Sequence, residues 1–164
     1  VNVGGECYCY GVVCYGTTSS PDSGRRAVRR SEGGVEDEAI YRAHPQLSRL
    51  LQTVFQVSLV AWQDGAAGAR VGLPPSPPPL HHSVHLADET ALRQISANLS
   101  YLNLLLAAEA PTPSEQILAA HLRRVAARRG NDRAWLQRAT RESARLLKHD
   151  HARLLALLHA VEPV

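Results

Sequence analysis

The sequence predicts an all-α protein, a four-helix bundle, and three observations lead to that prediction. Leu and Ala dominate the 164-residue chain from Leu86 to its end. Aromatic residues make up only 5% of the sequence, and a chain rich in Leu and Ala but poor in aromatics favours packed helices over sheets. In several segments apolar residues recur at intervals of three and four, which is the period of one helical face.

The composition divides the chain into two parts. Residues 1–35 are rich in Gly, Ser, Arg and Glu, so we expect a disordered or non-native N-terminal segment there. Residues 36–164 are predicted to form the helical bundle domain. The three cysteines, Cys7, Cys9 and Cys14, lie in the first part with the spacing C-x-C-x4-C. A zinc site commonly takes four ligands in paired C-x-x-C units, so this spacing favours a tail over a metal site.

A first helix is predicted between Glu36 and Gln63. Its apolar stripe consists of Leu47, Leu50, Leu51, Val54, Phe55 and Val57. The β-branched residues in this stripe lower its helix propensity, so packing against other helices must hold it. A long Pro-rich crossover follows from Asp64 to Leu86, and its prolines favour an extended polyproline conformation. Such a crossover would let the first two helices run parallel.

The second helix is the clearest in the sequence. Its stripe steps by three and four residues through Leu92, Ile95, Leu99, Leu102 and Leu106. Asp88 is expected to cap its N-terminus, because an Asp side chain accepts hydrogen bonds from the first free N–H groups.

Two more helices complete the predicted bundle. The third begins at Thr112-Pro113, with Thr112 as its cap and Glu115 completing a capping box, and ends at Gly130. The last is capped by Asn131 or Asp132 and runs from about Arg133 to Ala160.

Positive charge is concentrated in these last two helices. The chain has a net charge of +3, but ten basic residues lie close together: Arg123, Arg124, Arg128, Arg129, Arg133, Arg138, Arg141, Arg145, Lys148 and Arg153. A basic helical face suits a polyanion such as nucleic acid or heparin, an anionic membrane, or an acidic protein surface. A solvated outer face is the alternative.

Sequence patterns of enzymes are absent. There is no H-E-x-x-H, no G-x-S-x-G and no phosphate-binding glycine loop, so we expect no catalysis, no cofactor and no small-molecule substrate. His81, His82 and His85 have ligand-like spacing but lie in the Pro-rich crossover without a carboxylate nearby, which disfavours a metal site. No apolar run is long enough to cross a membrane. Asn98-Leu99-Ser100 matches a glycosylation sequon, a weak pattern that matters only for a secreted protein.

Three stretches, in this order, resemble the interleukin-6-type long-chain helical cytokines, in particular the cardiotrophin, ciliary neurotrophic factor and neuropoietin branch. Residues 40–51 resemble the start of the family's first helix, and they lead into a Gly- and Pro-rich crossover. Residues 99–102 ahead of Thr112-Pro113 resemble its second helix. Its final-helix motifs, Trp-x-x-Arg-Ala and Leu-Leu-Lys, are matched by residues 135–139 and 146–148.

The resemblance implies an up-up-down-down bundle that is secreted, lacks catalysis and binds cell-surface receptor ectodomains through helix faces. It makes Trp135, Arg138, Arg141 and Lys148 candidate receptor-binding residues, although Trp135 fits a core position equally well. The chain departs from the family in two ways: only Gly130 to Asp132 precede the last helix, and the Phe-x-x-Lys element is missing.

Two other function classes stay open. The first is an intracellular helical adaptor module that uses the basic face or the Pro-rich segment. The second is a nucleic-acid-binding protein, which the basic face allows but for which the sequence has no recognisable motif.

Overall fold

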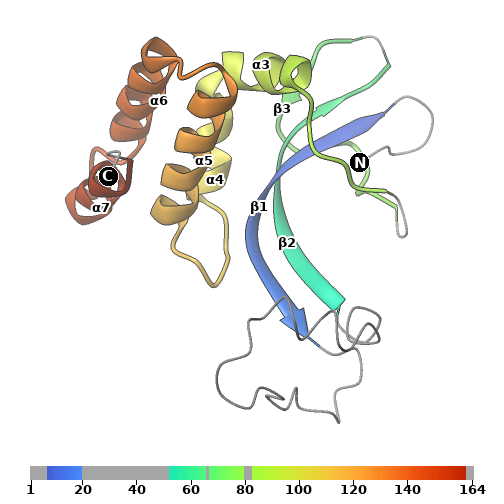
Figure 1. Cartoon of the computed structure of the whole chain (residues 1–164), viewed down its shortest axis with the longest axis horizontal. Coiled ribbons are helices and arrows are strands. Elements are labelled where there is room, and N and C mark those ends of the chain that lie inside the picture. The colour runs from blue at the N-terminus through green and yellow to red at the C-terminus, as the bar shows by residue number, and fades with distance from the viewer. Residues whose placement is uncertain (1–6, 20–51, 66, 80–82, 162–164) are drawn as a thin grey trace, which may run out of the picture. The chain divides into compact units, whose positions relative to one another are not determined.

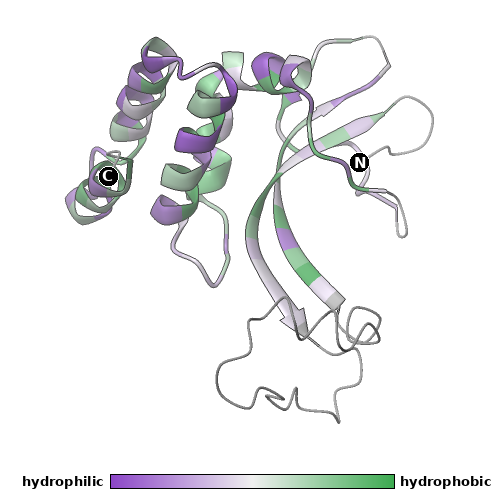
Figure 2. Cartoon of the chain, in the orientation of Figure 1, coloured by the Kyte–Doolittle hydropathy of each residue, from purple (hydrophilic) through white to green (hydrophobic). Residues whose placement is uncertain are grey.

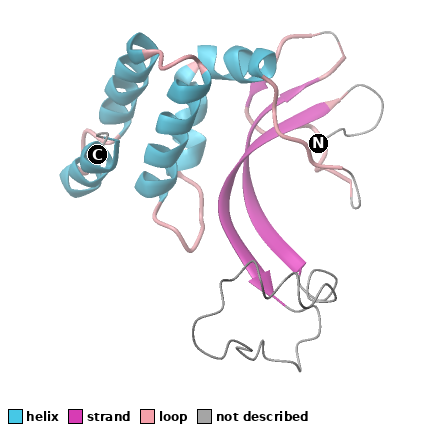
Figure 3. Ribbon diagram, in the orientation of Figure 1, coloured by secondary structure: helices cyan, strands magenta, loops and turns pink. Residues whose placement is uncertain are grey.

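The computed structural model describes residues 7–19, 52–65, 67–79 and 83–161. In this part of the chain it contains both strands and helices (Figures 1 and 3). The strands are β1 (Tyr8–Ser19), β2 (Gln52–Gln63) and β3 (Arg70–Val71), in the sheet order β1-β2-β3. The prediction of an all-α four-helix bundle is therefore wrong, and the fold is mixed α and β.

The largest error concerns the segment predicted as the first helix. Its described part, β2, is a strand, because Val54, Phe55 and Val57 belong to the β-branched and aromatic types that pack well on a sheet. A short apolar run fits both a helical stripe and a buried strand, so periodicity alone could not separate them. Leu47, Leu50 and Leu51 lie outside the described residues.

A second correction concerns the segment expected to be disordered. β1 lies within it, and its Tyr and Val residues favour a strand. Gly11 explains why β1 can approach β2 closely: a Cβ built on Gly11 would lie 2.2 Å from Val57 Cγ1. Because the surrounding sequence is rich in Gly and Ser, composition alone did not predict this short strand.

The chain forms two compact units. One consists of Val1–Cys14 and Val57–Val164, and the other of Tyr15–Gln56. In the described part of the second unit, the hydroxyl oxygens of Thr18 and Thr53 lie 3.2 Å apart, within hydrogen-bond distance. In the first unit, β2 and β3 pair antiparallel, with Ala61 opposite Val71 and Trp62 opposite Arg70.

The predicted second helix is interrupted. It consists of α3 (Glu89–Ala97), the 3₁₀ turn η1 (Leu99–Tyr101) and α4 (Leu102–Leu106). The predicted cap at Asp88 is confirmed, since its Oδ1 accepts from the N–H of Ala91 at 2.7 Å. The interruption falls at Asn98, whose backbone is extended and whose side chain accepts from the N–H of Ser100 at 3.0 Å. An Asn that caps a new turn competes with continuation of the helix.

Three further helices follow. They are α5 (Ser114–Arg128), α6 (Arg133–Leu146) and α7 (His151–Val161). Pro113 precedes α5 with no side-chain cap, so Thr112 does not have the predicted role. Asp132 caps α6 as predicted, accepting from the N–H of Trp135 at 2.9 Å. The turn before it carries Gly130 and Asn131 at φ 78 and 60, in the left-handed region.

The single last helix of the prediction is also divided. α6 ends at Leu146 and α7 begins at His151. Asp150 caps the new helix, accepting through Oδ1 from the N–H of Arg153 at 3.1 Å. The break lets α7 turn back to pack against both α5 and α6. A continuous helix could not pack on α5 in this way.

One apolar core joins the helices to residues 60 and 61 of β2. α5 is its central element, because it contacts α3, α4, α6 and α7. Figure 2 shows hydrophobic and hydrophilic residues on different sides of the helices, as expected when one face of each is buried. The largest fully buried side chains include Trp135, Tyr101, Leu102, Leu105, Leu118, Leu122 and Leu157.

Candidate functional site

The residues that the resemblance made candidates for receptor binding do not form one surface. Trp135 is 0% exposed and belongs to the core. Arg138, Arg141 and Lys148 are exposed. Trp135 is therefore an ordinary core residue. Of the four candidates, the three basic residues are accessible to a partner. Asn98 is also exposed, and its Oδ1 accepts a hydrogen bond from the N–H of Ser100 in η1.

The basic residues of the last three helices are of two kinds. Some stabilise the fold. Arg129 bonds Asp132 and Ser96, while Arg153 bonds Glu115, Ser114 and the carbonyl of Leu106. Arg123 is exposed but also joins α5 to α7, since it donates to the carbonyl of Ala160. The exposed remainder is Arg124, Arg128, Arg133, Arg138, Arg141, Arg145 and Lys148.

Three exposed arginines of α6 lie along one face. Arg138, Arg141 and Arg145 are separated by three and four residues, which places them on one side of a helix. Arg145 is paired with Glu142 through two bonds of 2.9 and 2.6 Å, and this carboxylate raises the pKa of the guanidinium. Among the described residues no salt bridge engages Arg138 or Arg141, so their charges remain available.

Beside this face, α6 and α7 enclose a hollow of about 480 Å³, here called the α6–α7 hollow. It is lined by Leu136, Gln137, Thr140, Arg141, Ala144, Leu158 and Val161. Most of these side chains are apolar or small, and Arg141 is the only charged one. The hollow thus combines a mainly apolar lining with one exposed cation.

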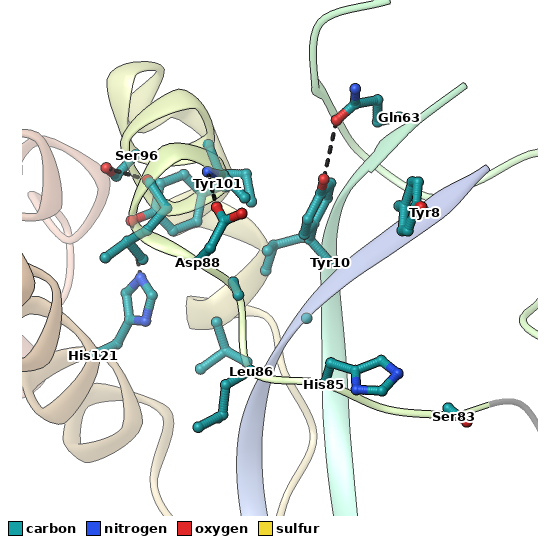
Figure 4. A pocket seen from close by; sticks show the side chains of 17 residues that line it. Tyr8, Tyr10, Gln63, Ser83, His85, Leu86, Asp88, Ser96, Tyr101 and His121 are labelled. Carbon is teal, nitrogen blue, oxygen red and sulfur yellow. Dashed lines mark hydrogen bonds between the residues drawn. The ribbon is translucent and has the colours of Figure 1, made fainter. Parts of the chain in front are cut away.

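A larger pocket lies between the sheet and the helices of the first unit. Its volume is about 1030 Å³, and we call it the tyrosine pocket because Tyr8, Tyr10 and Tyr101 line it together with Asp88 (Figure 4). Tyr8, Tyr10 and Val12 come from alternate positions of β1, so they share one face of the strand. Ile95 and Val60 add apolar walls from α3 and β2.

The deepest polar pair of this pocket is neutral. The Tyr101 hydroxyl and His121 Nε2 lie 2.9 Å apart, and the rings meet edge to face. Burial lowers the pKa of His121 from 6.5 to about 4 and raises the pKa of Tyr101 above its usual value. Near pH 7 both side chains are therefore uncharged, because burial penalises the charged form of each.

Nearer the strands, the Tyr10 hydroxyl donates to Gln63 Oε1 at 3.0 Å (Figure 4). The pKa of Tyr10 is raised, first by burial and then by the negative charge of Asp88. This pocket was not predicted from the sequence. The alternation of residues 8, 10 and 12 is the signal that would have indicated it, but it lies in the segment expected to be disordered.

The described residues contain neither a metal-binding cluster nor a membrane-spanning helix. There, no group of three or more His, Cys, Asp or Glu side chains could hold an ion. His85 lines the tyrosine pocket, whereas His81 and His82 lie outside the described part of the chain. Within that part, no helix combines the length and the apolar character needed to cross a bilayer.

Comparison of the chain with models of protein families, with curated proteins and with solved structures finds no match. The α6–α7 hollow and the tyrosine pocket are therefore the features from which a function can be inferred.

Proposed function

We propose that this chain is a protein-interaction module that binds an acidic amphipathic segment of another protein at the α6–α7 hollow. The observation that supports it is the combination of a mainly apolar lining that includes Arg141 with Arg138 on the adjoining face of α6. An amphipathic helix binds by placing its apolar side in such a groove, and acidic residues beside that side would meet the two arginines.

Protein is favoured over nucleic acid as the partner for two reasons. Protein interfaces combine apolar contacts with Arg anchors, as the hollow does. Single-stranded nucleic acid is bound on exposed aromatic side chains, and on α6 the only aromatic residue is Trp135, which is 0% exposed. Binding to an extracellular receptor ectodomain stays a prediction, and so does the absence of catalysis.

The test uses the whole chain and fluorescence anisotropy. The probe is a labelled helical peptide with leucine on one face and glutamate on the flanks. Arg141→Glu is expected to weaken binding about tenfold, because it places like charges together at the site. The matched control is Arg124→Glu on α5, which makes the same charge change at an exposed position outside the hollow.

Three outcomes would contradict the proposal. One is an equal loss of affinity from both charge reversals. Another is equal affinity for a peptide of the same composition in scrambled order. The third is tighter binding of duplex DNA than of the peptide at the same salt concentration, which would favour the nucleic-acid class.

A further inference from the structure

The tyrosine pocket differs from the α6–α7 hollow in its charge. Among the described residues that line it, Asp88 is the only carboxylate, and none is Lys or Arg. The other titratable side chains in its lining are Tyr8, Tyr10, Tyr101, His85 and His121. A tyrosine is neutral near pH 7, as is His121, so the fixed charge of the pocket is the negative charge of Asp88.

Arg129 lies outside the lining of the pocket but acts electrostatically on Tyr101. Its Nε donates to Asp132 Oδ2 at 3.3 Å and its Nη1 donates to Ser96 Oγ at 3.0 Å. The carboxylate of Asp132 therefore offsets part of the positive charge of Arg129.

Asp88 retains acceptor capacity for a ligand. Its Oδ1 accepts from the N–H of Ala91 at 2.7 Å, and this cap holds the side chain in place. A carboxylate has two oxygens with about four acceptor sites, so the cap uses only a fraction of them. A side chain that is already ordered loses little entropy when a ligand binds.

Aromatic rings line the same pocket as this carboxylate. Figure 4 shows Asp88, Tyr10 and Tyr101 among the side chains that line the pocket, and the negative charge of Asp88 raises the pKa of Tyr10. Tyr10 is anchored by its bond to Gln63, whereas Tyr8 is 44% exposed. Rings of this kind attract a cation through the negative charge of their faces when it lies within about 6 Å.

We propose that the tyrosine pocket binds an organic cation, an alkylated ammonium group attached to an apolar body. The Asp88 carboxylate is its counter-ion, Tyr8, Tyr10 and Tyr101 surround the ammonium group, and the apolar body packs on the walls formed by α3 and β2. The volume of about 1030 Å³ is at the upper end for small-molecule pockets, which is why the ligand has a body in addition to its charged group.

The test compares two probes that differ only in charge. Butyrylcholine carries a trimethylammonium group, and dimethylbutyl butyrate carries an uncharged tert-butyl group in its place. Each is titrated into the isotopically labelled whole chain and followed by NMR chemical shifts. Butyrylcholine is expected to bind at least about fivefold more tightly, since the cation–π and carboxylate contacts act on it alone, with shifts at Asp88 and Tyr10.

Three variants assign the contacts. Asp88→Asn keeps a good N-cap but removes the charge, so it is expected to reduce the preference for the cation to the part that the aromatic rings supply, while leaving the fold intact. Tyr10→Leu removes a ring and is expected to weaken the binding of butyrylcholine. Tyr10→Phe keeps the ring and is expected to bind butyrylcholine nearly as tightly as the parent chain does. Thermal unfolding of each variant checks the fold.

Equal affinity for the two probes would overturn the proposal, and so would an unchanged preference in Asp88→Asn. The absence of binding by either probe to the folded parent chain would overturn it too. These results are independent of the peptide assay, because the tyrosine pocket and the α6–α7 hollow share no lining residue.

Discussion

The indole nitrogen of Trp135 donates a buried hydrogen bond of 2.8 Å to the main-chain carbonyl of Ser96. This bond joins the start of α6 to the end of α3. Ser96 is also the acceptor for Arg129 at 3.0 Å and itself donates to the carbonyl of Leu92 at 2.6 Å. Arg129 in turn bonds Asp132 and lies 5.6 Å from the centre of the Trp135 ring. The network connects the end of α3 with the turn between α5 and α6 and with the start of α6, across 33 and 39 residues of sequence.

Trp135→Phe is expected to destabilise the chain by about 2–3 kcal/mol, because it leaves a cavity and an unpaired buried carbonyl at Ser96. Urea denaturation followed by circular dichroism measures the change. Trp62→Phe is the control. Because Trp62 is only half-buried in β2, this substitution should lower the free energy of unfolding by less. Equal losses from both substitutions would show that the bond to Ser96 contributes little.

Acidification is expected to destabilise the fold through His121. Its pKa is about 4 in the folded chain and 6.5 when unfolded, so the unfolded state binds more protons between these values and stability falls as the pH drops from about 6.5 to 4. The full effect is about 3 kcal/mol at 1.36 kcal/mol per unit. The measurement is the free energy of unfolding at several pH values.

The control for this pH dependence is a pair of substitutions. His121→Gln keeps a neutral hydrogen-bonding side chain for Tyr101 and should flatten the profile in this window. His149→Gln, at an exposed position, should leave it unchanged. A profile that is the same in the parent and in His121→Gln would assign the pH dependence to other groups.

Gly11→Ala is expected to weaken the pairing of β1 with β2. The added Cβ would lie 2.2 Å from Val57 Cγ1 and 3.1 Å from the carbonyl oxygen of Ser58, so side chain and backbone must shift, at a cost of about 1–3 kcal/mol. Gly16→Ala in the same strand has nothing within 4 Å and should change stability little. Thermal unfolding compares them, and equal melting temperatures would contradict the close approach.

Arg153→Lys is expected to destabilise the docking of α7 by about 1–2 kcal/mol, because an ammonium cannot reproduce the fork of guanidinium bonds. Arg153 donates to Glu115 at 3.3 Å and to the carbonyl of Leu106 at 3.2 Å, and it also bonds Ser114. Arg145→Lys provides the control on an exposed pair, where little change is expected. Chemical denaturation would show whether the two differ.

Local signals in the sequence correctly indicated several helix starts. Asp88 and Asp132 cap α3 and α6 as predicted, because an N-cap depends only on a side chain and the N–H groups two or three residues beyond it. The same rule failed at Thr112, since Pro113 is the N-cap and makes no side-chain bond. It also missed Asn98 and Asp150 as caps inside segments that had been predicted as continuous helices.

The candidate site was less accessible to sequence reasoning. Arg138, Arg141 and Lys148 are exposed as a binding role requires, but Trp135 is in the core, and residue type alone does not distinguish an interface anchor from a buried aromatic. The tyrosine pocket is lined by residues of β1, α3 and α5. No local sequence pattern predicts that these distant segments come together.

Local sequence patterns determined that the chain is mainly helical after Asp88 and where α3 and α6 begin, because helix period and capping are local. Only the tertiary structure decided that residues 52–63 form a strand, that the last helix breaks so that α7 packs on α5, and which arginines are exposed. An apolar run of that length gains similar burial as a helix or as a strand, so the partner it packs against decides its conformation. That partner is β1, which lies far away in the sequence.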